Sequence, residues 1–227
     1  MNRNKKLIVA LDVPDREEIL FLAQLLRDEV AMVKIGLEGF VAHGPKLVRE
    51  IVDLGVEVFL DLKLHDIPRT ASAAAKQVSN LGVSLLTIHA AGGAAMVRAV
   101  RDSLNPQTAL IAVTVLTSLD ADALKKIGFV SNTQQTAHTL GNLALANGAD
   151  GLVCSAHELD ALSSLSGVRV VPGVRPLGSE VYDQRRVATP KVAINAGATW
   201  IVVGRPIITA AKPLDAAKAI NLELTKV

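Results

Sequence analysis

Residues 59–70 read FLDLKLHDIPRT, a strand-like alternation of apolar and polar residues that ends at Pro68. Asp61, Lys63 and Asp66 place three charges within six positions, in a chain of which half is hydrophobic. Buried charge is unfavourable unless it is paired. The segment is therefore either a surface turn or the end of a buried strand whose charges have a chemical role.

The apolar part of this segment belongs to a pattern that recurs along the chain. Eight short runs, nearly continuous in apolar residues, are separated by segments with helical period such as residues 16–29, 45–55 and 134–148. Such runs are typical of strands buried on both faces of a parallel sheet. The expected strands lie at residues 6–13, 31–37, 57–63, 84–90, 109–116, 150–156, 168–174 and 199–205.

Strand and helix alternating eight times predicts the α/β class and a (β/α)8 TIM barrel. A doubly wound open sheet is the alternative, because the pattern by itself does not show closure. Since no linker or low-complexity tract interrupts the chain, we expect residues 1–227 to form a single domain.

The composition narrows the class of protein. Only 3% of the residues are aromatic, so the core must be aliphatic, and the net charge of +2 is close to balance. Without a basic tail or a basic–aromatic pattern, nucleic acid is not an expected partner. The single cysteine, Cys154, excludes an internal disulfide and fits a reducing compartment. The N-terminal apolar run is too short for a signal peptide and no run predicts a membrane span, so we expect a cytoplasmic protein.

Polar residues collect where the expected strands end, which in a barrel is the rim that carries active sites. Asp61 and Lys63 are two apart and should both face the barrel interior, within reach of Lys34 on the preceding strand. With Asp66 in the following loop, we expect an alternating Lys–Asp–Lys–Asp array whose central aspartate stays ionised. A structural ion-pair network is the alternative, but the strand-end position and the added charges favour catalysis. His65 is expected to be packed or hydrogen-bonded.

A second group of residues predicts a phosphate site after the seventh and eighth strands, a usual place for one in a barrel. Gly173 and Gly204 permit close approach of the backbone, and Arg205 can grip two phosphate oxygens. Arg175 and Gln184 lie in a loop long enough to fold over a ligand. A solvated surface loop is the alternative for that segment.

We expect neither a metal site nor a dinucleotide site. His43, His138 and His157 lie on expected helices without paired ligands, and no dinucleotide fingerprint is present. His89 ends the fourth strand and either lines the site or makes a structural hydrogen bond. Cys154 is expected to belong to the core.

The segment DLKLHDIPRT resembles the signature DLKFHDIPNT of the orotidine 5′-monophosphate decarboxylase family. Several such motifs in one order, on the expected strand ends, are far more specific than a single one. The others are IVALDV (8–13), VKIG (33–36), IAVTVLTS (111–118), PGVRP–GSE–DQRR (172–186) and GRPI (204–207). The chain departs from the family pattern at Leu64, Arg69 and Tyr182, all outside the charged array. Tyr182 could alter loop closure, and Arg69 could alter an interface.

The resemblance implies decarboxylation of orotidine 5′-monophosphate to UMP, the last step of pyrimidine synthesis, without a metal or organic cofactor. It also implies a homodimer with active sites at the interface, where Asp66 and Thr70 reach into the partner's site. Lys63 is implied to protonate C6 beside Asp61, and Lys34 and Asp66 to complete the array. The residues implied to bind substrate are Asp12, Lys34 and Thr70 at the ribose, Asp61 at the carboxylate, Thr117 at the pyrimidine, and Arg175, Gln184, Gly204 and Arg205 at the phosphate.

Two other functions remain open at this point. A related barrel enzyme that acts on sugar phosphates with Mg²⁺ would share the D-x-K spacing but lacks the HDIP continuation. A non-catalytic barrel that binds a phosphate ligand would not need Lys63.

Overall fold

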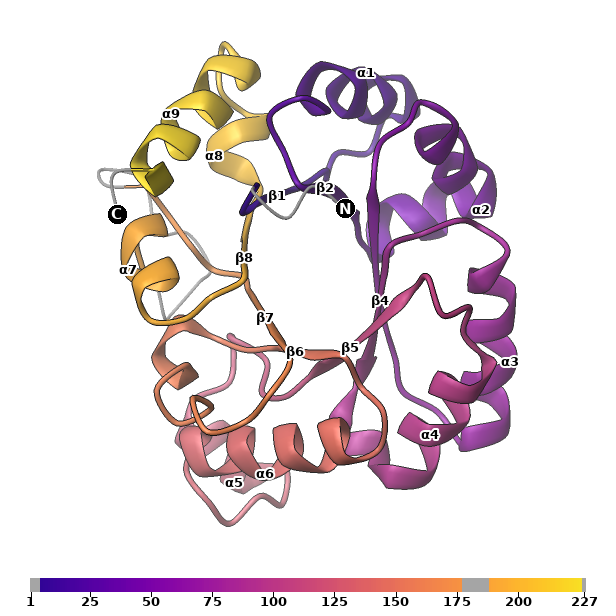
Figure 1. The fold of residues 1–227 in the computed structure, drawn as a ribbon, viewed down its shortest axis with the longest axis vertical. Coiled ribbons are helices and arrows are strands. Elements are labelled where there is room, and N and C mark those ends of the chain that lie inside the picture. Colours follow the sequence, from indigo (N-terminus) through magenta and orange to yellow (C-terminus); the bar gives the residue numbers. More distant parts are fainter. Residues whose placement is uncertain (1–4, 177–187, 226–227) are drawn as a thin grey trace.

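The computed structural model describes residues 5–176 and 188–225 of the chain. Its strands form a closed parallel barrel in the order β1 to β8, with the helices around the outside (Figure 1). The strands are β1 (Leu7–Ala10), β2 (Met32–Ile35), β3 (Val58–Leu64), β4 (Leu85–His89), β5 (Ala109–Val113), β6 (Gly151–Val153), β7 (Val168–Val171) and β8 (Trp200–Val203). The helices are α1 (Arg16–Leu26), α2 (Leu37–Asp53), α3 (Pro68–Ser79), α4 (Gly93–Ser103), α5 (Ala121–Lys126), α6 (Thr133–Ala146), α7 (Pro190–Asn195), α8 (Arg205–Ile208) and α9 (Pro213–Thr225), with 3₁₀ turns η1 (Ala90–Gly92) and η2 (Ala156–Glu158).

The first and last strands close the barrel. Leu7 lies opposite Ile201, and Val9 lies opposite Val203, in the parallel pair of β1 and β8. This pairing confirms the predicted TIM barrel and excludes the open sheet. All of the expected strands are present, and all except β3 are shorter than the runs that predicted them. The runs are longer because buried residues continue past the strand ends; Cys154, just beyond β6, is fully buried as expected of a core residue.

Both faces of the strands are buried, which explains the continuous apolar runs. On β1, Leu7 and Val9 belong to the layer between barrel and helices, whereas Ile8 and Ala10 belong to a separate cluster inside the ring. The large members of the inner cluster are Ile8, Met32, Phe59, Leu85, Ile111, Val113, Val153, Val170, Trp200 and Val202. This core is predominantly aliphatic, as the composition predicts.

Helix α2 differs from its sequence prediction in where it begins. The helical period predicts a helix over residues 45–55, but α2 begins at Leu37 and is kinked at Gly44, whose φ is 66°. Gly44 tolerates this left-handed conformation because it has no Cβ. Pro45 then opens the second half, where its missing N–H removes no helical hydrogen bond. The sequence therefore showed only the part of the helix that follows the kink.

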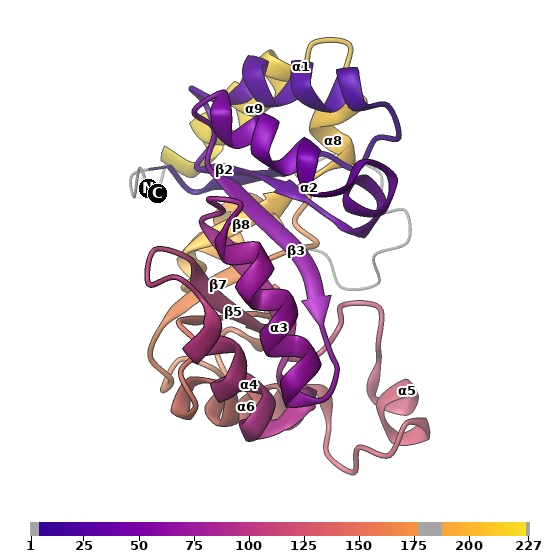
Figure 2. The same ribbon diagram turned by 90° about the vertical axis from the view of Figure 1, so that its right-hand side faces the viewer.

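The connection after β5 is long, and it carries α5 away from the ring formed by the other helices (Figure 2).

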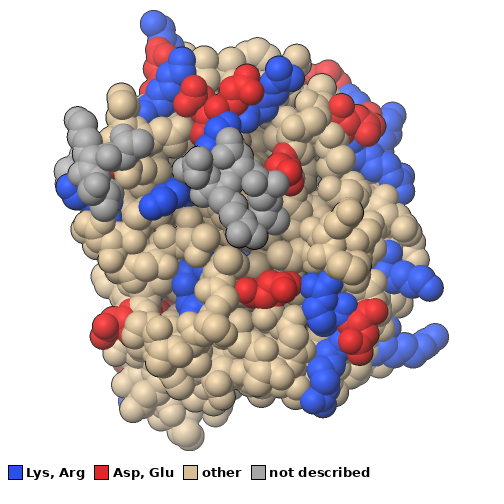
Figure 3. Space-filling model, in the orientation of Figure 1, with Lys and Arg blue, Asp and Glu red and all other residues tan. Residues whose placement is uncertain are grey.

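The lower part of Figure 3, over α5 and α6, is mostly uncharged, and charges of both signs occupy its upper and right-hand parts. Such mixing fits the net charge of +2. Among the described helices, none combines the length and the apolar character needed to cross a membrane.

Candidate active site

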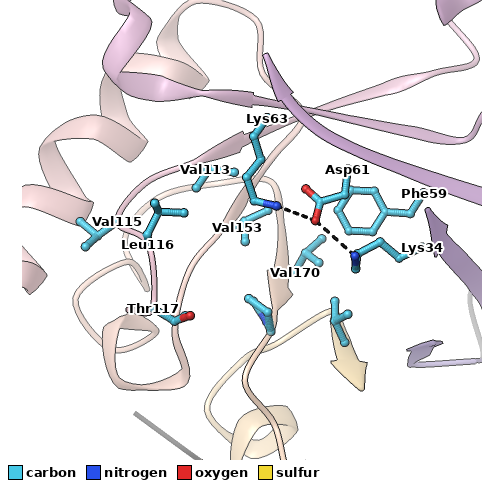
Figure 4. Close-up of a pocket in the computed structure, with 12 residues that line it drawn as sticks. Lys34, Phe59, Asp61, Lys63, Val113, Val115, Leu116, Thr117, Val153 and Val170 are labelled. Atoms are coloured by element: carbon cyan, nitrogen blue, oxygen red, sulfur yellow. Dashed lines mark hydrogen bonds and ion pairs between the residues drawn. The ribbon is translucent and has the colours of Figure 1, made fainter. Parts of the chain in front are cut away.

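The carboxyl ends of the strands surround two adjoining pockets. The inner pocket has a volume of about 150 Å³ and mainly apolar walls, with three charged side chains along one side (Figure 4). The outer pocket, of about 360 Å³, shares Lys34, Pro172 and Val202 with the inner one, so the two are adjacent. The inner pocket is lined by Lys34, Phe59, Asp61, Lys63, Val113, Val115, Leu116, Thr117, Val153, Val170, Pro172 and Val202.

Four charged side chains from three neighbouring strands form an alternating row. The Nζ atom of Lys63 donates a hydrogen bond to Oδ2 of Asp61 at 2.7 Å. The Nζ atom of Lys34 lies 3.7 Å from the same oxygen of Asp61 and 3.1 Å from Oδ1 of Asp12, a residue that follows β1. Figure 4 shows Lys63, Asp61 and Lys34. Asp61 and Lys34 are mostly buried, whereas Asp12 is about half exposed. The contacts among Lys34, Asp61 and Lys63 are those that the spacing predicts.

The contact between Asp61 and Lys63 depends on an irregular stretch of β3. Leu60 pairs with Leu86 of β4, and Leu64 pairs with Ile88. Since β3 has more residues than β4 between these two pairs, β3 bulges there. Lys63 has a φ of 50° and is the one non-glycine residue with positive φ in the described part of the chain. A bulge of this kind re-aims side chains and is frequent beside active sites.

Asp61 remains ionised in this setting. Burial by itself would raise the pKa of the carboxyl group. The charges of Lys34 and Lys63, with hydrogen bonds from Lys63 and Thr87, outweigh burial and hold the pKa of Asp61 below its ordinary value. The site therefore carries a fixed negative charge between two ammonium groups.

The outer pocket brings together the residues expected at a phosphate. Arg175 and Arg205 both line it, with Gly173 and Gly204. Arg175 is buried and donates a hydrogen bond from Nη1 to the carbonyl oxygen of Val174 at 3.0 Å. A Cβ on Gly204 would lie 3.4 Å from Cβ of Ala10, so a side chain there would crowd β1.

Two residues expected in the phosphate loop cannot be placed. Gln184 and Tyr182 lie outside the described residues. Thr117, expected near the pyrimidine, lines the inner pocket.

Asp66 does not join the row within one chain, which corrects the array expected from the spacing. Its Oδ1 accepts a hydrogen bond from the backbone N–H of Ile67 at 2.7 Å, and the residue is exposed. Thr70, in the first turn of α3, is exposed as well. Asp66 lies in the short connection between β3 and α3, before Pro68 begins the helix. Asp12, rather than Asp66, is the second carboxylate beside Lys34.

Two histidines, His65 and His89, lie near the charged row and contact one another. The rings of His65 and His89 are 5.4 Å apart and tilted relative to one another. Burial, followed by the nearby His65 and Lys63, lowers the pKa of His89, while Asp61 opposes the shift. His65 is exposed rather than packed, although it contacts His89. Neither ring lines the described inner or outer pocket.

Sequence reasoning missed Thr87 of β4. It is fully buried, and its hydroxyl contacts both Asp61 and the backbone of Lys63. The available signal was a polar residue inside the apolar run SLLTIHA, on the strand next to the D-x-K segment. Within residues 5–176 and 188–225, no group of three or more His, Cys, Asp or Glu side chains is arranged to hold a metal ion.

The comparison with known proteins agrees with this geometry. Residues 5–220 match the family described as Orotidine 5′-phosphate decarboxylase / HUMPS family. The orotidine 5′-phosphate decarboxylase of Anaeromyxobacter dehalogenans is 48% identical over 223 residues, which cover 97% of this chain and 98% of that protein.

Solved structures show the same likeness. The crystal structure of orotidine 5′-phosphate decarboxylase from Lactobacillus acidophilus superposes with a TM-score of 0.85 at 34% identity, covering 97% of this chain and 99% of that one. The orotidine 5′-monophosphate decarboxylase of Methanocaldococcus jannaschii, solved in complex with the inhibitor BMP, gives a TM-score of 0.79 at 25% identity, covering 97% and 98%. With its family match across nearly the whole chain, this protein belongs to the orotidine 5′-phosphate decarboxylase / HUMPS family.

Proposed function

We propose that this protein decarboxylates orotidine 5′-monophosphate to UMP and CO2 in pyrimidine biosynthesis. One observation carries the proposal: the ion pair of Asp61 and Lys63 lines a mainly apolar pocket that adjoins a second pocket with two arginines. A pyrimidine nucleotide has matching parts, a flat base at one end and a phosphate dianion at the other. The relatives that carry this activity in their names support the assignment.

Lys63 is the proton donor in this proposal. Loss of CO2 breaks the bond from C6 to the carboxylate carbon and leaves the electron pair of that bond on C6. The ring offers no electron sink for this pair, so a fixed positive charge beside C6 has to stabilise it. The Lys63 ammonium supplies that charge and transfers a proton to C6, which forms UMP. Its contact with Asp61 at 2.7 Å holds the ammonium in place before the substrate binds.

Asp61 acts on the carboxylate that departs. Its ionised side chain disfavours the bound carboxylate more than the neutral CO2 that leaves, which is a differential effect of the kind that accelerates a reaction. Lys34 lies between Asp61 and Asp12 and balances their charges. In this proposal Lys34 and Asp12 also hold the ribose hydroxyls, because both line the outer pocket next to the inner one.

The phosphate end supplies binding energy far from the reacting carbon. Arg175, Gly204 and Arg205 line the outer pocket and bind the phosphate in this proposal. Gln184 is proposed to join them. Thr117 contacts the pyrimidine in the inner pocket. Energy released at the phosphate can position the base, so it lowers the barrier as well as strengthening binding.

The proposal includes a homodimer whose two active sites each use Asp66 and Thr70 of the other chain. Both residues are exposed, Asp66 just before α3 and Thr70 in its first turn, and Asp66 bonds the backbone N–H of Ile67. Large apolar side chains are also exposed at the beginnings of α2 and α3, which follow the neighbouring strands β2 and β3. These are Leu37 (54% exposed), Val41 (80%) and Ile67 (64%). Exposed apolar groups around polar ones support a protein interface there.

The decay of orotidine 5′-monophosphate absorbance, with EDTA present and the product identified as UMP, tests the proposed function. Turnover in EDTA is the expected result. A folded protein that binds UMP but leaves the substrate unchanged would overturn the proposal. Activity that depends on Mg²⁺ and a sugar phosphate would instead assign the chain to the other branch of barrel enzymes considered above.

A further inference from the structure

Thr87 is a buried polar residue to which the proposed mechanism gives no role. It lies in the middle of β4, its solvent exposure is 0%, and it does not line the inner or the outer pocket. A hydroxyl in such a place needs hydrogen-bond partners. Both of its partners belong to the D-x-K segment of β3.

The hydroxyl of Thr87 forms a hydrogen bond with each of the two charged residues of that segment, Asp61 and Lys63. It donates to Oδ1 of Asp61 at 2.8 Å and accepts from the backbone N–H of Lys63 at 2.9 Å. The direction of both bonds follows from the chemistry. An ionised carboxylate can only accept, an amide N–H can only donate, and a hydroxyl can do both.

Thr87 lies opposite the β3 bulge, which explains why a side chain is needed to bond the backbone N–H of Lys63. Between the pairs Leu60–Leu86 and Leu64–Ile88, three residues of β3 face Thr87 alone. The regular ladder is interrupted there, and the Lys63 N–H is bonded by a side chain instead of a strand carbonyl. Lys63 is at the same time in the left-handed region, with a φ of 50°. A strained residue at a site persists when its surroundings hold it.

We propose that Thr87 is a positioning residue, whose single hydroxyl fixes the Asp61 carboxylate and the bulged Lys63 backbone relative to one another. Oδ1 of Asp61 is held by Thr87, which leaves Oδ2 to receive Lys63 and to face Lys34. The ammonium of Lys63 is thereby directed into the inner pocket before substrate arrives. This inference rests on the proposed function for its kinetic consequence, but not for the geometry that it describes.

Replacing the hydroxyl tests this role. Thr87→Val keeps the shape and removes both hydrogen bonds. We expect kcat to fall by about 10- to 100-fold, the effect of a small misplacement of a catalytic group, while the Kd for UMP changes little. Thr87→Ala and Thr87→Ser lack the same methyl group and differ only in the hydroxyl, so Ser should recover most of the rate that Ala loses. The comparison of the alanine and serine variants tests the inference even if the valine variant does not fold.

Thr108→Val is the matched control. Thr108 is also buried, and its hydroxyl donates to the carbonyl oxygen of Val83 at 2.9 Å, at the opposite end of the barrel. The control should lose stability as Thr87→Val does but keep its kcat. Equal rates for Thr87→Ala and Thr87→Ser, with an active wild type, would overturn the inference and leave the proposed function intact.

A second measurement does not depend on turnover. Carbon-13 NMR titration of the Asp61 carboxyl should show a higher pKa in Thr87→Ala than in Thr87→Ser, because the Thr87 hydroxyl is among the groups that lower it. If the wild type does not turn over orotidine 5′-monophosphate, the proposed function fails while this titration still tests Thr87. An unchanged Asp61 pKa in Thr87→Ala would show that the hydroxyl does not hold the carboxylate.

Discussion

The Nζ atom of Lys34 lies 3.1 Å from Oδ1 of Asp12, and this ion pair spans the boundary between the two pockets. Lys34 lines both pockets, whereas Asp12 lines only the outer one. The pair thus connects the charged row of the inner pocket with the part of the site proposed to bind the ribose and phosphate.

Gly36 leaves room for this pair. A Cβ at Gly36 would lie 2.9 Å from Nζ of Lys34 and 3.2 Å from Oδ1 of Asp12. We therefore expect Gly36→Ala to displace the pair and lower kcat/KM by about 10-fold. Gly39→Ala, in the first turn of α2, is the control, because its Cβ would make only ordinary contacts of 3.6 Å with the side chains of Ile19 and Ile35. Equal kcat/KM values for the two variants would contradict this reading of Gly36.

Lys63→Ala removes the proposed proton donor. We expect kcat to fall by about 100- to 10,000-fold, the range for loss of a general acid or of a charge-stabilising group. The Kd for UMP should stay within a few fold, because the phosphate residues are untouched. Lys76→Ala, at an exposed position of α3, should turn over at the wild-type rate. A near-normal rate for Lys63→Ala would show that another group protonates C6.

Arg205→Ala tests the proposed phosphate site. A charged hydrogen bond contributes about 1.5–3 kcal/mol, so the Kd for UMP should rise by roughly 10- to 100-fold. The affinity for uridine, which lacks the phosphate, should hardly change. Arg98→Ala is the control, since Arg98 pairs with Asn147 outside both pockets. If UMP and uridine lost affinity equally, Arg205 would not be a phosphate ligand.

Asp61 makes stability depend on pH in a defined direction. Its pKa in the folded protein lies below the ordinary value of 3.8, so its stabilising contribution is complete above that value and is lost as the pH falls through the folded pKa. We expect Asp61→Asn to lower the free energy of unfolding by about 1–3 kcal/mol at neutral pH. Urea titrations should show a constant difference from wild type down to about pH 5, and a narrowing one below pH 3.8.

The exposed Asp160→Asn variant serves as the control for this titration and should differ little from wild type at any pH. A difference between wild type and Asp61→Asn that is unchanged at the lowest pH would show that ionisation of Asp61 is not its source.

The shared active site can be tested by mixing two inactive variants. Lys63→Ala and Asp66→Ala should each be inactive as homodimers. Each hybrid dimer has one intact site if Asp66 serves the partner's site, so subunit exchange in an equal mixture should restore about a quarter of the wild-type activity. No recovery, with hybrid dimers present by mass spectrometry, would place Asp66 in its own chain's site or outside the mechanism.

The sequence alone determined the class of fold and most members of the candidate site. Barrel strands are buried on both faces, so continuous runs such as SLLTIHA carry the strand signal, and strand ends locate the rim. The approach of Lys34 to Asp61 followed from the alternation of side chains and from the adjacency of consecutive strands. The contact of Asp61 with Lys63 was expected from the same spacing, but the structure makes it across a bulge.

Only the tertiary structure decided what depends on pairing between distant segments. Closure rests on the register of Leu7 with Ile201, which the pattern within either strand does not specify. The second carboxylate beside Lys34 is Asp12, whereas Asp66 is exposed and bonds the backbone N–H of Ile67. The role of Thr87 arises from a bulge in one strand facing a hydroxyl on the next. Periodicity records which face of its own element a residue occupies, whereas register and bulges between strands decide which side chains then meet.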